Sequence, residues 1–251
     1  MNYKWNWGVF FQRAMFGEGT YLDWVLSGLQ WTIAVSLAAW VIAFSVGSAV
    51  GVLRTTTWRI PRALAAAYVQ LFRNVPLLVQ MFIWYFVVPE LVPRALGQWM
   101  KTDMPMPEVT SAILCLGFYT ASRVGEQVRS GIQSIPRGQT DAARALGFNE
   151  PQVYRYVLLP RAYRVIIPPM TSEFLTIFKN SSVALTIGVL ELTARARQIT
   201  EFTFQGFEVF TLTTVLYVLI TLTVIAIMRV VETRARVPGF IGAAPAQRAG
   251  L

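Results

Sequence analysis

Histidine is absent from the 251 residues, and cysteine occurs once, at Cys115. Without histidine the chain has no imidazole to act as a general base or a metal ligand, and with one cysteine it can form neither an intrachain disulfide nor a Cys/His metal cluster. We therefore expect no metal site, no cofactor bound by this chain and no independent catalysis. Charged residues are also scarce, at 14%, whereas 55% of the residues are hydrophobic. This composition predicts an integral membrane protein.

The distribution of apolar residues predicts an all-α fold with five transmembrane helices. Residues 24–53 contain no Asp, Glu, Lys or Arg, and this run is longer than the roughly 20 apolar residues needed to cross a hydrocarbon core. Less apolar runs follow it. The five predicted spans are 26–53, 63–88, 109–128, 165–190 and 209–228.

Basic residues alternate between the predicted connections. The 54–62 connection has three arginines and no acid, the 129–164 connection has six arginines against two acids, and the tail after 228 has four arginines against one acid. The other connections are balanced or acidic. Cytoplasmic loops are enriched in Lys and Arg, so the N-terminus is predicted outside and the C-terminus in the cytoplasm. The formal net charge of +9 then faces anionic membrane lipid, and nucleic acid is not an expected partner.

Three parts of the chain are predicted. Residues 1–23 contain Trp5, Trp7, Phe10 and Phe11, which suit an interfacial segment at the outer surface of the membrane. Residues 24–236 form the transmembrane domain, with a cytoplasmic loop at 137–160. Residues 237–251 are rich in Gly, Pro and Ala and are predicted to be a mobile tail.

The loop at 137–160 carries the signals of two short helices. The first is expected near Thr140, whose hydroxyl could cap it, and to stop at Gly147. The second is expected to start at Asn149 and to close at Pro160. On the first helix, small and apolar side chains share one face, which either docks a partner or packs against other cytoplasmic connections. These side chains are Ala142, Ala145 and Leu146.

The run GQTDAARALGFNEPQVYRYVLLPRA resembles the EAA motif of ABC-importer permease subunits, with Asp141 where that family usually has Glu. The resemblance continues through RNVPLLVQMFIWYF, EQVRSGIQSIPRGQ and PPMTSEFLTIFKNSSVALTIGVLELT, and covers most of residues 70–195. It is closest to the permeases of polar amino-acid importers of the HisM/HisQ type. It implies the type I, MetI-like fold in the bacterial inner membrane, with the EAA loop as a coupling helix.

The resemblance also implies partners and coupling residues. The expected partners are a cytoplasmic ABC ATPase dimer, a second permease subunit that is either a paralogue or an identical copy, and a periplasmic amino-acid-binding protein. The chain has no G-x-x-x-x-G-K-[ST] motif, so ATP and Mg are expected to be used by the ATPase. The predicted coupling residues are Asp141, Ala142, Ala143, Leu146 and Gly147.

Ionisable residues inside the predicted spans are candidates for the substrate pathway, because a charge in the bilayer is costly. They are Arg123, Glu126, Glu173 and Lys179. An alternative is a set of ion pairs that holds the third and fourth spans together: Glu126 is three residues from both Arg123 and Arg129, and Lys179 could pair with Glu173.

The identity of the residue at position 123 indicates the substrate class. In relatives that carry other polar amino acids, the segment matching ASRVGEQVR commonly reads Tyr-x-x-Glu-x-x-Arg, and Arg123 stands at the Tyr position. Because a guanidinium can bind a carboxylate with two hydrogen bonds, the resemblance implies acidic amino acids, glutamate and aspartate first.

Two other functions fit a helical membrane subunit. One is an ion-coupled amino-acid carrier that works alone, and the other is a channel or scaffold subunit that transports nothing. A lone carrier generally needs more spans and an internal repeat, and the sequence has neither.

Overall fold

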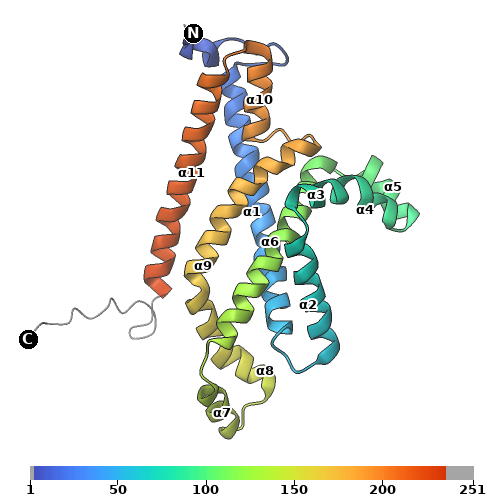
Figure 1. Cartoon of the computed structure of the whole chain (residues 1–251), viewed down its shortest axis with the longest axis vertical. Helices are drawn as coiled ribbons and strands as arrows, with labels where there is room; N and C mark the ends of the chain where they lie inside the picture. The colour runs from blue at the N-terminus through green and yellow to red at the C-terminus, as the bar shows by residue number, and fades with distance from the viewer. Residues whose placement is uncertain (1–2, 236–251) are drawn as a thin grey trace, which may run out of the picture.

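The computed structural model describes residues 3–235 and contains no β-strand within them. The predicted tail at 237–251, and the end of the domain predicted to reach 236, lie outside the described residues. Figure 1 shows a helical bundle with the N-terminal segment and α10 at one end and with α7 and α8 at the other. The fold class predicted from the sequence is therefore confirmed as all-helical.

The first and last predicted spans are confirmed as long apolar helices. α1, Tyr21–Leu53, begins at a capping box in which the Thr20 hydroxyl accepts from the Asp23 backbone N–H and the Asp23 carboxylate accepts from the Thr20 backbone N–H. α11, Gly206–Ala235, has 30 residues. Within residues 3–235, these are the two helices that are long and apolar enough to cross a membrane without a partner segment. The third span corresponds to α6, Pro107–Gln133, which is long enough at 27 residues but less apolar.

The prediction of one continuous span at 63–88 is wrong. α2, Arg59–Asn74, ends before Pro76, and the helical run Leu77–Leu91 leaves it at 108°. Proline cannot donate a backbone hydrogen bond and forces the residue before it into an extended conformation, as Val75 shows with φ −96° and ψ 130°. Gln80 fills the break, since its Nε2 donates to the carbonyls of Phe72 and Val75 at 2.8 and 2.9 Å.

The run Leu77–Leu91 comprises α3, Leu77–Phe82, a π-helical turn at Ile83–Val87, and α4, Val88–Leu91. α5, Arg94–Thr102, follows within the connection predicted at 89–108. Figure 1 shows α4 and α5 projecting sideways from the bundle.

The helix predicted to close at Pro160 instead continues into the fourth span. α8, Glu150–Gln152, runs through a π-helical segment, Val153–Leu158, into α9, Leu159–Asn180, and then into a 3-10 segment, Ser181–Ile187. The wider π turn accommodates the proline, because it relieves the clash of the ring with the preceding turn.

The connection predicted at 191–208 also contains a helix. α10, Leu192–Thr203, leaves the fourth span with a bend of 51° and packs against α1. The buried Glu191 carboxylate caps it by accepting the backbone N–H groups of Thr193 and Ala194 at 2.9 and 2.8 Å, and it also accepts the Tyr217 hydroxyl at 3.0 Å. Hydropathy alone does not predict this helix, because the segment contains charged residues.

α1 and α6 form the most extensive helix contact, and two glycines of α1 allow it. A Cβ atom added at Gly47 would lie 2.6 Å from Val124 Cβ, and one added at Gly51 would lie 2.6 Å from Val128 Cβ. The Gly-x-x-x-Gly spacing therefore allows close packing of two helices within the chain.

We expect Gly47→Ala to destabilise this contact by about 1–3 kcal/mol, since the added methyl group forces α1 and α6 apart. Thermal unfolding of the purified protein in detergent should show a lower Tm. Gly138→Ala is the control, because a Cβ at Gly138 meets no atom within 4 Å. Equal Tm values for the two variants would contradict the proposed packing role.

Candidate functional site

Glu126 on α6 is the centre of a cluster of arginines. Its carboxylate forms ion pairs with Arg54, just after α1, and with Arg129, whose Nε lies 2.8 Å from Oε1. Arg73, near the end of α2, approaches it more loosely at 3.7 Å. The alternative pairing of Glu126 with Arg123 is not formed within residues 3–235, and Arg54 takes that place. The sequence did not predict Arg54 and Arg73 as partners of Glu126. Each lies at the end of a helix, where an arginine side chain is expected to reach the membrane–water interface.

Arg123 and Glu173 face one another across α6 and α9. Arg123 Nη1 lies 3.7 Å from Glu173 Oε1, which is beyond ordinary hydrogen-bonding distance. The Arg123 side chain is 42% exposed, whereas that of Glu173 is 12% exposed. Tyr119, one turn earlier on α6, holds the guanidinium through a hydrogen bond from Arg123 Nη2 at 3.3 Å and through its ring at 5.4 Å. A loose ion pair between Arg123 and Glu173 thus connects α6 and α9.

Lys179 lies near the end of α9 and is exposed. The structure gives it no ion pair with any part of the chain from 3 to 235, so the alternative pairing of Lys179 with Glu173 is not formed.

The predicted coupling residues lie on α7, Arg137–Ala145, and at the two positions directly after it, at the end of the bundle opposite the N-terminal segment (Figure 1). α7 begins at Arg137, three residues before the predicted cap, with Pro136 at its N-cap position, and the Thr140 hydroxyl donates to the Arg137 carbonyl. Thr140 therefore does not cap the helix, since its hydroxyl lies within the first turn. Gly147 has φ +86° and ends the helix as predicted. Asn149 and Gln152 form the predicted second start as a capping box.

Asp141, Ala142 and Ala145 are exposed on α7, and Leu146, directly after the helix, is 79% exposed. Ala143 is the exception, because it is only 5% exposed and packs with the hydrophobic cluster of Val153 and Leu158. Within the chain, Ala143 therefore holds α7 against the following helix, and its role in coupling stays a prediction. Helix periodicity places Ala143 on the opposite side from Ala145, two residues further along the helix.

Ion pairs and a hydrogen bond stabilise α7 and the helical segment that follows it. Arg144 Nε lies 2.9 Å from Glu150 Oε1, and Arg144 Nη1 lies 3.4 Å from Asp141 Oδ1. The hydrogen bond to Glu150 raises the pKa of Arg144 above its ordinary value. The Tyr154 hydroxyl donates to Thr55 Oγ1 at 3.1 Å and so joins this loop to the segment after α1. The Arg144–Glu150 pair is not evident from the sequence, because the two residues lie on different helices.

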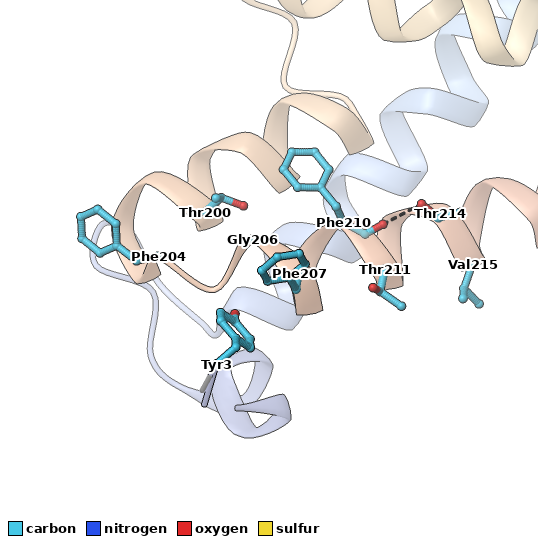
Figure 2. Close-up of a pocket in the computed structure, with 9 residues that line it drawn as sticks. All are labelled: Tyr3, Thr200, Phe204, Gly206, Phe207, Phe210, Thr211, Thr214 and Val215. Carbon is cyan, nitrogen blue, oxygen red and sulfur yellow. Dashed lines mark hydrogen bonds between the residues drawn. The ribbon is translucent and has the colours of Figure 1, made fainter. Parts of the chain in front are cut away.

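An apolar cavity of about 710 Å³ lies at the other end of the molecule. Figure 2 shows the rings of Tyr3, Phe204, Phe207 and Phe210 around it. Tyr3 packs on Phe207 at 4.8 Å between ring centroids and donates to Glu208 at 2.5 Å, so the N-terminal segment is attached to the start of α11. The residues that line the cavity carry no formal charge, so the cavity is unsuited to a charged amino acid.

The helical bundle thus carries ionisable side chains on α2, α6 and α9 and a small exposed helix at one end. The chain belongs to the family of binding-protein-dependent transport system inner membrane components, which matches residues 41–237. It is therefore a multi-pass protein of the inner membrane.

Individual relatives agree with this assignment. The chain is 51% identical over 245 residues to the glutamate/aspartate import permease protein GltJ of Escherichia coli strain K12, covering 96% of this chain and 99% of GltJ. Its structure is similar to that of an amino acid ABC transporter crystallised with histidines, with a TM-score of 0.72, 28% identity, and coverage of 85% of this chain and 95% of the other. The inward-facing methionine transporter MetNI shares the fold, with a TM-score of 0.69, 21% identity, and coverage of 86% and 98%. The predicted MetI-like permease fold is thus confirmed.

Proposed function

We propose that this chain forms half of the translocation pathway of an ATP-driven importer of acidic amino acids, with glutamate and aspartate as its substrates. The observation that carries this proposal is the position of Arg123 on α6. Its guanidinium lies 3.7 Å from the Glu173 carboxylate, which leaves it free to bind a substrate carboxylate. The extensive similarity to a protein named as a glutamate/aspartate import permease supports the same substrates.

The partners follow from surfaces that the single chain leaves open. Arg73 is 50% exposed and Arg123 is 42% exposed on helices of a membrane domain, where contact with lipid would be costly. A second permease subunit, either a paralogue or an identical copy, would enclose these charges in a water-filled pathway. A periplasmic binding protein would deliver the substrate at the outer end.

A cytoplasmic ABC ATPase dimer would bind α7 and would use the ATP and Mg. The exposed Ala142, Ala145 and Leu146 suit a shallow groove, because small side chains let the helix backbone approach the partner closely. The N-terminus would then be periplasmic and the C-terminus cytoplasmic, in agreement with the basic connections at 54–62 and 129–164.

Cysteine labelling tests this orientation. Cys115 is buried, so the unmodified chain should react little with a membrane-impermeant maleimide. In intact cells we expect labelling of Glu18→Cys and none of Leu146→Cys, which should react only after lysis. The reverse pattern would refute the proposed orientation.

Gly147→Leu tests the coupling surface. Leucine at a positive φ is strained by roughly 1–2 kcal/mol, so the turn after α7 should shift and ATP-driven uptake in proteoliposomes should fall by about 10-fold or more. Gly147→Asn is the matched control, because asparagine tolerates this conformation and should retain most of the uptake. Full uptake by the leucine variant would contradict coupling through α7. Uptake driven by an ion gradient without ATP would favour the lone-carrier alternative.

Arg123→Ala tests the substrate. With a binding protein that accepts both glutamate and glutamine, we expect glutamate uptake to fall by about 10-fold to 100-fold and glutamine uptake to fall much less, because only glutamate has the second carboxylate. Size-exclusion chromatography should show an assembled complex. Equal losses for the two substrates, or recovery when Glu173→Gln is added, would show that Arg123 serves only to pair with Glu173.

A further inference from the structure

The charged residues where α2, α6 and α9 meet do not neutralise one another. Arg54, Arg73, Arg123 and Arg129 share two carboxylates, those of Glu126 and Glu173. The group therefore has two more positive than negative charges. Such an excess within a membrane domain is costly unless an anion is bound there.

Glu126 is already satisfied by two of these arginines. Arg54 and Arg129 both form close ion pairs with it, whereas Arg73 remains 3.7 Å away with half of its side chain exposed. Arg73 also lies close enough to Glu173 to interact with it electrostatically. Arg73 is thus the least engaged cation on the Glu126 side of the group.

Glu173 is incompletely satisfied. Its Oε1 has only the long contact with Arg123, and its Oε2 is buried and accepts no hydrogen bond from any residue between 3 and 235. Leaving a buried carboxylate oxygen without a donor is unfavourable, so a donor is expected from outside the chain. An ammonium group, which brings both positive charge and N–H donors, is well suited to this position.

We infer that Arg123, Glu173 and Arg73 form a three-point receptor in which Glu173 binds the ammonium group of the substrate and Arg73 binds its α-carboxylate. This inference rests on the proposed function, in which Arg123 binds the side-chain carboxylate. The receptor presents positive, negative and positive groups in that order, and an acidic amino acid presents side-chain carboxylate, ammonium and α-carboxylate. The ligand class is therefore a zwitterion with a second acidic group.

The test uses the purified transporter complex without binding protein and four ligands titrated by calorimetry. Glutamate has all three groups, glutarate lacks the ammonium, 4-aminobutyrate lacks the α-carboxylate, and glutamine lacks the charged side chain. In the wild type each of the three analogues should bind about 10-fold or more weakly than glutamate, since each leaves one charged group of the site without a partner.

Each variant should lose affinity for every ligand except the one that lacks the matching group. Glu173→Gln should weaken glutamate and glutamine by about 10-fold to 100-fold and leave glutarate unchanged. Arg73→Gln should weaken glutamate, glutamine and glutarate and leave 4-aminobutyrate unchanged. Arg62→Gln is the matched control for Arg73, since Arg62 is exposed on the same helix about three turns away and should affect no ligand.

Two results would overturn the inference. One is wild-type affinity for glutarate equal to that for glutamate, and the other is a loss for Glu173→Gln that is the same for all four ligands. Elution of each variant as the assembled complex guards against loss of folding. If the wild-type complex takes up no glutamate in the presence of ATP and binding protein, the proposed function fails; if it takes up glutamate but the variants lack this ligand pattern, only the receptor fails.

Discussion

The close contact between α1 and α6 determines where the charges of the pathway lie. One side of α6 meets α1 with residues spaced at i, i+4, i+7 and i+11: Gly117, Ala121, Val124 and Val128. Two residues along the chain correspond to a rotation of about 200°, so residues offset by two occupy the opposite side of the helix. Tyr119, Arg123 and Glu126 have this offset. Because small and β-branched side chains fix one side of α6 to α1, its other side must carry its charges toward α2 and α9.

The proline break after α2 places Arg73 at the end of a helix, where an uninterrupted helix would not place it. If α2 continued through residue 76, Arg73 would lie inside the helix, with a further helical turn after it. Instead the chain turns by 108°, and Gln80 satisfies the carbonyls that the break leaves free. Arg73 consequently lies at a helix end, with half of its side chain exposed and Glu126 within 3.7 Å. A helix end is also a favourable place for a cation, because the last carbonyls carry partial negative charge.

The sequence predicted some elements well and others poorly, for physical reasons. α1 and α11 were predictable because each contains a long apolar run. α10 was not, since a helix with charged residues resembles a loop when only hydropathy is considered. The continuation through Pro160 depends on a π-helical turn that has no strong local signal. Among the site residues, Arg123 and Glu173 could be paired from their positions on neighbouring spans, but Arg54 and Arg73 meet Glu126 only through tertiary packing, and the inward orientation of Ala143 depends on the cluster beneath α7.

The helical continuation past Pro160 connects the proposed coupling helix, α7, to the proposed substrate pathway. A helical segment runs from Glu150, which is paired with Arg144 on α7, to Ile187, and it contains Glu173. At 1.5 Å per residue, Glu173 lies about 35 Å along this segment from Glu150. Had the helix ended at Pro160, a flexible joint would separate α7 from the pathway. In the proposed importer, a displacement of α7 by the ATPase would instead act on one end of the same helical segment that presents the Glu173 carboxylate, and rigid elements of this kind transmit small shifts between distant sites.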